Sequence, residues 1–219
     1  MSESAYLRAA KTAYDTVAVD YGRFLREELA AKPVDRAMLA AFVEQVREAD
    51  AGPVADLGCG SGRVTAHLAS LGLDVFGVDL SPQMVAVARE TYPGLRFEEG
   101  TMTALDLAAG SLGGVVSWYS IVHTPPEVLP TVFAEFSRVL APGGHLLLGF
   151  KAGDKLKHLS NAYGHDLSLD VYWMQPDRIA DLLAEAGIVV HARLVREPDR
   201  MERPRHGPQA FFLGHKAQA

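Results

Sequence analysis

Residues 54–62 have the sequence Val-Ala-Asp-Leu-Gly-Cys-Gly-Ser-Gly, an apolar run that ends in three glycines at alternate positions. The pattern predicts a buried strand that turns sharply into a helix over residues 63–71. Because glycine has no Cβ, Gly58, Gly60 and Gly62 allow positive φ angles and a close approach of a ligand to the backbone. The helix start adds unpaired N–H groups and partial positive charge. We therefore expect a polar or partly anionic ligand at this turn.

The spacing of the glycines disfavours two phosphate-binding loops. A dinucleotide-binding G-x-G-x-x-G motif counted from Gly58 and Gly60 would need a third glycine where Arg63 stands. A Walker loop would need Lys and Ser or Thr after its last glycine, but Arg63 and Val64 follow Gly62. A nicotinamide-dependent oxidoreductase on a related sheet is therefore an alternative and not the main prediction.

The remaining pattern, D-x-G-x-G-x-G over residues 56–62, resembles motif I of the class I S-adenosylmethionine (SAM)-dependent methyltransferases. The resemblance implies that the turn packs against the amino-acid end of SAM and that Asp56 serves the amino group of SAM, directly or through water. The segment RVLAPGG at residues 138–144 is similar to the R-x-L-x-P-G-G segment before the fifth strand of that family. Its physical content is a helix stop and a tight turn.

Asp79 ends a second apolar run, residues 73–78, and Ser81-Pro82 then predicts the start of a helix through Arg89. Ligands of open α/β sheets bind at the carboxyl ends of the strands, and one carboxylate can accept bonds from both hydroxyls of a ribose. We expect this role for Asp79. The alternative is that Asp79 only caps the helix.

The resemblance implies further contacts to SAM and to its product S-adenosylhomocysteine (SAH). Thr101 stands where many members have an acid that meets adenine, and its hydroxyl or backbone could bind the adenine amino group. The segment at residues 117–120 lacks the Asn/Asp-Pro-Pro-Tyr/Phe motif of enzymes that methylate DNA bases or protein glutamine, so those substrates are not expected. The full predicted cofactor set is Tyr14, Tyr21, Asp56, Gly58, Cys59, Gly60, Gly62, Arg63, Asp79, Leu80, Met84, Thr101, Met102, Trp118 and Tyr119.

Composition predicts one globular domain over residues 1–219, with 48% hydrophobic and 22% charged residues. The net charge of −6 argues against a nucleic-acid or anionic-membrane surface, because phosphates are bound mainly by clustered Lys and Arg. A single cysteine permits no internal disulfide, and no N-terminal apolar stretch suggests a signal peptide or membrane helix. We expect a cytoplasmic monomer or homodimer.

Strand and helix patterns alternate along the chain, which predicts a doubly wound α/β fold. The resemblance implies a Rossmann-like, seven-stranded, mostly parallel sheet with helices on both faces and a C-terminal antiparallel hairpin. The predicted strands are 53–57, 73–78, 95–98, 114–118, 145–150, 189–195 and 209–215, with a polar loop at 196–208. Residues 5–29 are predicted to form one or two helices, and further helices are predicted at 34–46, 127–140 and 176–186.

The N-terminal residues 1–32 are predicted to form a helical lid. Leu7, Tyr14 and Tyr21 recur every seven residues and share one face of a continuous helix. In similar small-molecule methyltransferases an aromatic N-terminal helix closes over SAM, and a tyrosine ring could contact the sulfonium through its π face. The alternative is ordinary helix packing.

Residues 151–174 interrupt the alternation and are predicted to be an insertion over the active site. Apolar residues at 167, 169 and 171 alternate with polar ones, as in a half-buried strand. Aromatic side chains here would suit a flat, mostly apolar acceptor, although Trp173 could simply pack the insertion onto the sheet. The predicted acceptor-binding set is Tyr119, His123, His158, Tyr163, His165 and Trp173.

His123 is the candidate catalytic residue because it follows the fourth predicted strand, where methyl donor and acceptor should meet. An unperturbed imidazole titrates near neutrality and could act as a general base. The alternative is that His123 only lines the site, because alignment alone can carry an in-line methyl transfer. No histidine pair has a metal-ligand spacing with supporting acids, so we expect no catalytic metal.

These features predict a SAM-dependent methyltransferase that acts on a small molecule, an aromatic or heteroaromatic intermediate of secondary metabolism. The acceptor atom could be oxygen, nitrogen or carbon. Besides the oxidoreductase, a non-catalytic SAM-binding regulator is an alternative.

Overall fold

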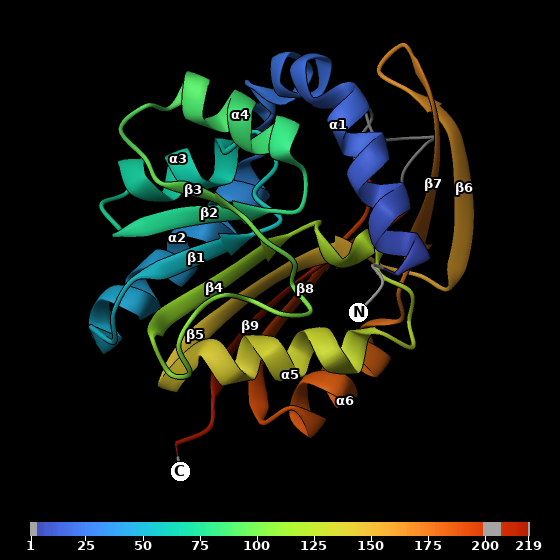
Figure 1. Ribbon diagram of the computed structural model, residues 1–219. Helices are drawn as coiled ribbons and strands as arrows, with labels where there is room; N and C mark the ends of the chain where they lie inside the picture. Colours follow the sequence, from blue (N-terminus) through green and yellow to red (C-terminus); the bar gives the residue numbers. More distant parts are fainter. Residues whose placement is uncertain (1–3, 199–206, 219) are drawn as a thin grey trace.

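The computed structural model describes residues 4–198 and 207–218 and has a central sheet of seven strands (Figure 1). All neighbouring strands are parallel except β9, which is antiparallel to both of its neighbours. The predicted α/β fold with a C-terminal antiparallel hairpin is thereby confirmed. In spatial order the strands are β3 (Phe97–Glu99), β2 (Val75–Asp79), β1 (Val54–Leu57), β4 (Leu112–Trp118), β5 (Leu140–Lys151), β9 (Gln209–Lys216) and β8 (Ile188–Arg196).

Helices cover both faces of the sheet because successive strand residues point to opposite sides. Val116 and Leu147 pack with α2 (Pro33–Ala49) and α3 (Arg63–Ser70). Their neighbours Val115 and Leu148 pack on the other face with α5 (Leu129–Val139) and α6 (Pro176–Glu185). The fifth flanking helix, α4 (Pro82–Thr91), packs against β3 through Val85 and Ala88. Two apolar layers therefore hold the sheet and fix the ends of its strands.

The boundary between α5 and β5 differs from the prediction. The helix ends at Val139, and the strand begins at once with Leu140, which pairs with Leu112 before an irregularity in the register. Pro142-Gly143-Gly144 therefore lies inside β5, where Gly143 has a φ of 77°, and is not the helix stop that the sequence predicted. Pairing with β4 outweighs the helical periodicity at this position.

Two segments outside the sheet stand at the carboxyl ends of its strands (Figure 1). The long helix α1 (Ala5–Leu25) packs against α4 and is followed by the short 3-10 helix η1 (Glu28–Ala31), so the predicted region 5–29 contains two helices. The predicted insertion is a separate two-stranded hairpin of β6 (Lys155–Ala162) and β7 (His165–Trp173). In β7, Leu169 and Val171 are buried and Asp170 is exposed, which confirms the predicted half-buried strand.

The hairpin rests on α1, so these two segments form one roof over the sheet edge (Figure 1). Part of the predicted polar loop, residues 199–206, and residues 1–3 of the predicted lid lie outside the described residues. Among the helices that the structure describes, none is long and apolar enough to cross a membrane.

Candidate functional site

A cavity lies at the carboxyl edge of β1, β2 and β4 and is covered by α1. The empty space between its walls, together with the open solvent at its mouth, amounts to about 830 Å³. Its lining includes eleven of the predicted site residues, namely Tyr14, Tyr21, Gly58, Gly60, Asp79, Leu80, Thr101, Met102, Trp118, Tyr119 and His123. The structure therefore brings together residues from α1, the glycine turn and three strand ends.

The three glycines of the turn have different roles, some in packing and some in lining the cavity. Gly58 has a φ of 75°, and a Cβ there would lie 2.2 Å from the Ser120 Cβ. At Gly62, with a φ of 82°, a Cβ would lie 2.7 Å from the Phe97 ring. Gly62 does not line the cavity and instead lets the start of α3 pack on β3, whereas Gly58 and Gly60 form part of the wall.

Asp79 lies at the end of β2 with both carboxylate oxygens oriented by the backbone. Oδ2 accepts the Gly60 N–H at 2.7 Å and Oδ1 accepts the Ser81 N–H at 2.9 Å. Burial raises the pKa of Asp79, and these backbone N–H groups oppose that rise. The N-cap of α4 is Ser81, whose Oγ accepts the Met84 N–H, so Asp79 is not the cap. A carboxylate has about four acceptor positions, so Asp79 retains acceptor capacity toward the cavity.

Asp56 lies under the turn and does not line the cavity. Its Oδ2 accepts a hydrogen bond from Thr65 Oγ1 at 2.7 Å, while Oδ1 is buried and has no partner in the described part of the chain. Burial raises the pKa of Asp56 to about 6, and the Thr65 hydrogen bond opposes that rise. An unsatisfied buried oxygen is costly, so this atom suits a bound water or cationic group.

The inner face of α1 carries the predicted heptad residues. Leu7, Tyr14 and Tyr21 all line the cavity, and the rings of the two tyrosines meet edge to face with centroids 5.8 Å apart. Asp15 fastens the helix to α4, because its Oδ1 accepts the Ser81 hydroxyl at 2.6 Å and the Gln83 N–H at 3.2 Å. The placement of α1 over the cavity therefore depends on polar contacts as well as apolar packing.

His123 lies in the 3-10 helix η2 (Ile121–His123) after β4, and both of its ring nitrogens have partners. Nδ1 lies 2.8 Å from the backbone oxygen of Asp170, and Nε2 lies 2.7 Å from the Tyr14 hydroxyl. The pKa of His123 is lowered to about 4, mainly by burial and also by the nearby Lys151, while the hydrogen bond to Asp170 opposes the change. His123 is therefore a neutral ring near pH 7.

Tyr119, directly before this segment, has a φ of 58°, which is the left-handed region that non-glycine residues seldom adopt. Its N–H donates to the Gly149 carbonyl at 2.8 Å, and its ring meets those of Trp118 and Phe211. Strained residues held by surrounding contacts cluster at functional sites. The conformation holds Tyr119 in the cavity wall.

Three other predicted cofactor residues lie near the turn but outside the lining. Cys59 packs with Val85 and Phe97, and Met84 packs with α1. Arg63 forms an ion pair with Glu28 at 3.0 Å. Their surroundings indicate packing and the anchoring of η1.

Four of the predicted acceptor residues also lie outside the lining. His158 pairs with the Asp170 carboxylate, and His165 pairs with Asp20 of α1 at 2.9 Å. The Tyr163 ring meets Tyr21. Trp173 is 5% exposed and belongs to the main apolar core, in agreement with the packing alternative.

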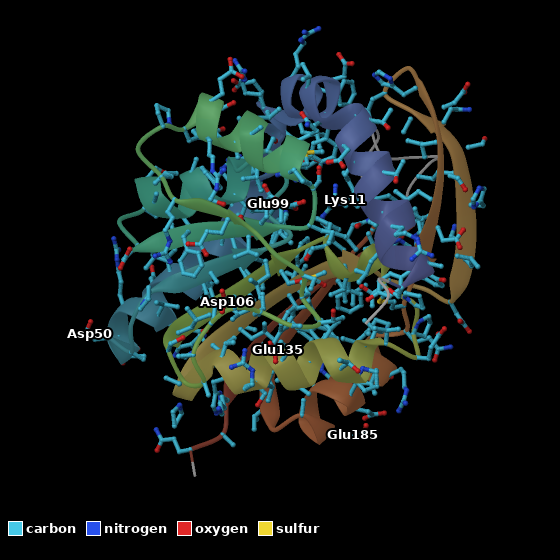
Figure 2. The ribbon with its side chains drawn as sticks, in the orientation of Figure 1. Lys11, Asp50, Glu99, Asp106, Glu135 and Glu185 are labelled. Carbon is cyan, nitrogen blue, oxygen red and sulfur yellow. The ribbon has the colours of Figure 1, made fainter. Side chains whose placement is uncertain are left out.

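The remaining lining residues were not among the predicted contacts. Helical spacing could have revealed Ala10 and Lys11, which precede Tyr14 by four and three positions. Figure 2 shows Lys11 on the side of α1 nearest the sheet. Chain position alone gave no signal for the others, which are Tyr6, Val78, Ser81, Gly100, Thr103, Ser120, Thr124 and Val132.

Comparisons with known proteins agree with this geometry. A family model described as a methyltransferase domain matches residues 54–144. A demethylmenaquinone methyltransferase of Beutenbergia cavernae is 32% identical over 135 residues, which are 62% of this chain and 55% of that protein. The matched stretches cover 37% to 55% of the first curated relatives, so the chain spans about half of their length or less.

Two solved structures share the fold over the whole of this chain. The DhpI–SAH complex has a TM-score of 0.74 with 17% identity and is covered completely. A 1,6-didemethyltoxoflavin-N1-methyltransferase of Burkholderia thailandensis, with bound 1,6-didemethyltoxoflavin and SAH, has a TM-score of 0.68 with 19% identity and is covered to 93%. The order of the seven strands agrees with the fold that the resemblance implied, and we conclude that residues 54–144 form a methyltransferase domain similar to those of the class I SAM-dependent methyltransferases.

Proposed function

We propose that the protein transfers a methyl group from SAM to a small-molecule acceptor and releases SAH. The observation that carries this proposal is Asp79, an oriented carboxylate beside Gly60 at the edge of a covered cavity. A carboxylate with free acceptor positions at the end of the second strand suits the hydroxyls of a ribose. The methyltransferase domain matched at residues 54–144 supports the same ligand.

The chain offers groups that fit each part of SAM. Asp79 would hold the ribose, and Thr101 and Met102 would lie at the adenine. The walls at Gly58 and Gly60, with the unsatisfied Asp56 oxygen beneath them, suit the amino-acid end. When bound, SAM supplies an electrophilic methyl group on a positively charged sulfur. Exclusion of water by α1 would strengthen the electrostatic contacts around that charge.

We further propose an aromatic or heteroaromatic acceptor, an intermediate of secondary metabolism. Support comes from the cavity wall, where Tyr6, Tyr14, Tyr21, Trp118 and Tyr119 supply aromatic rings. Rings of this kind suit flat apolar ligands. The negative net charge supports a partner that is a small molecule and not a nucleic acid, and the single cysteine supports a cytoplasmic location.

Calorimetry with SAM, SAH and NAD, followed by transfer of a labelled methyl group to a panel of phenols and heteroaromatic N–H compounds, tests the proposal. We expect binding of SAM and SAH, no binding of NAD and labelling of at least one compound. Binding of NAD alone would support the oxidoreductase alternative. SAM binding with no transfer to any compound would support the non-catalytic regulator.

A further inference from the structure

The two hydrogen bonds of His123 determine which of its nitrogens carries the proton. The Asp170 carbonyl can only accept, so His123 Nδ1 must carry a hydrogen and donate it over 2.8 Å. In a neutral ring the other nitrogen is then an acceptor, and Tyr14 donates its hydroxyl hydrogen to Nε2 over 2.7 Å. The basic lone pair of His123 is therefore directed at Tyr14 and not at the open part of the cavity.

Tyr14 is the group that remains available to an acceptor. Its hydroxyl hydrogen is used toward His123, but the phenol oxygen keeps acceptor lone pairs, and Tyr14 lines the cavity. Burial raises the pKa of Tyr14 well above its ordinary value, and the nearby Tyr21, Tyr163 and Asp79 raise it further. A phenolate is thus disfavoured, so Tyr14 can take a proton only if it passes its own proton on.

We propose that Tyr14 accepts the proton of the methyl acceptor while its own hydroxyl proton moves to His123 Nε2. This inference rests on the methyl transfer proposed above and adds the route of the proton. The acceptor O–H or N–H bond breaks and an O–H bond forms at Tyr14, while the former Tyr14 O–H bond breaks and an N–H bond forms at His123. The acceptor gains the methyl group, and the imidazolium loses its proton to water between turnovers.

The surroundings of His123 define what this relay contains. Tyr14 comes from α1, Asp170 from β7 and Lys151 from β5, and these supply the titratable or charged groups that act on the ring. The Asp170 carbonyl keeps its bond to Nδ1–H when the ring is protonated, so it fixes the ring orientation and favours the positive charge. His123 thereby acts through Tyr14, and the relay is complete only when lid and hairpin are both in place.

The pairing can be tested without turnover by NMR of the chain with ¹⁵N-labelled histidine and bound SAH. We expect the Nδ1–H tautomer of His123 at pH 7. In Tyr14→Phe we expect a higher pKa of His123, because the neutral ring loses the hydroxyl that donates a hydrogen bond to Nε2. Tyr92→Phe is the matched control, since it removes a phenol hydroxyl outside the cavity lining and should leave the titration unchanged. An unchanged titration in Tyr14→Phe would overturn the pairing on which the proposal depends.

Kinetics tests the proton transfer with the phenol or N–H compound that the panel identifies. Tyr14→Phe and His123→Gln should each lower kcat by about 10²–10⁴, and the double variant should be no slower than the slower single variant, because the two residues act as a unit. A nitro-substituted analogue that is already ionised at the assay pH should restore much of the lost rate in all three variants. Tyr92→Phe should retain the wild-type rate.

Other results would overturn the relay. Loss of kcat in His123→Gln with full kcat in Tyr14→Phe would make His123 a direct base. A higher KM for SAM with unchanged kcat in Tyr14→Phe would leave Tyr14 as a binding residue, and methylation only of acceptors without a transferable proton would also exclude the relay. Absence of SAM and SAH binding in wild type would instead refute the proposed function, and the NMR comparison could still be made without ligand.

Discussion

Asp79 is the side chain that we expect to hold the ribose of SAM, because two backbone N–H groups orient its carboxylate beside the cavity. We predict that Asp79→Ala weakens SAM binding by about 1.5–3 kcal/mol, the range for hydrogen bonds to a charged group. Calorimetry measures the change, and thermal unfolding checks that the variant is folded. Asp74→Ala is the matched control, since Asp74 is exposed just before the same strand and should leave affinity unchanged. Equal affinity in folded Asp79→Ala would refute the assignment.

Asp56 and His123 give a second prediction, because burial shifts their pKa values in opposite directions. The pKa of His123 is about 4 in the folded chain against an ordinary 6.5, so its contribution to stability is complete above pH 6.5 and is lost as the pH falls to 4. The pKa of Asp56 is about 6 against 3.8, so its contribution is complete below pH 3.8 and is lost as the pH rises through 6. Across its own pH range each group changes the free energy of unfolding by about 3 kcal/mol. Between pH 4 and 6 the two changes have opposite signs and cancel.

Single substitutions should expose each slope. Relative to wild type, Asp56→Asn should lose about 1.4 kcal/mol of unfolding free energy per pH unit on acidification from 6 to 4, and His123→Gln should gain about as much. Urea unfolding at pH 4, 5 and 6 measures the difference. The double variant should again follow wild type across this range, whereas parallel curves for all four proteins would contradict both assignments.

At the level of single residues, local sequence predicted the turn and the position of Asp79 at a strand end, because both depend on the adjacent backbone. It could not predict that His123 Nε2 meets Tyr14, since this contact joins residues 109 positions apart. For Trp173 the sequence left two roles open. An aromatic residue in a predicted roof suits both a ligand and a core, and only tertiary packing places it in the core.

Among the elements, α1 is the one whose position should depend most on ligand. We predict that hydrogen exchange in residues 5–25 slows when SAH binds, because a ligand in the cavity contacts the inner face of the helix. Asp15→Ala should speed exchange of α1 in the absence of ligand by removing its bonds to Ser81 and Gln83. Exchange mass spectrometry measures both effects, and α6, on the far side of the core, serves as the internal control. Identical exchange of α1 with and without SAH would leave it a structural helix only.

The elements themselves were predicted best where periodicity is strong. The half-buried pattern of residues 167–171 correctly gave a strand, but its partner β6 is mostly exposed and has no alternation to reveal it. The early start of β5 was missed because Leu140 continues the apolar stripe of the preceding helix, while its pairing with Leu112 is a long-range contact. Such pairings decide element boundaries that local sequence leaves open.

For the whole molecule, ligand binding should appear as a gain in stability. At a SAH concentration 100 times its Kd, linkage adds about 2.7 kcal/mol, which should raise Tm by about 5–10 °C in a chain of this size. NAD at the same concentration should leave Tm unchanged. Differential scanning calorimetry measures both shifts, and a rise with NAD but not with SAH would refute the proposed cofactor.

The position of β9 between β5 and β8 has a consequence for the synthesis of this protein. Among the strands that the structure describes, β8 pairs only with β9, so it cannot join the sheet until residues 209–216 have left the ribosomal tunnel. Until then β5 presents an open edge, and the apolar residues of β9 that will be buried are not yet in place. An unpaired strand edge promotes association between nascent chains. Chaperone engagement during translation should therefore last until this strand emerges.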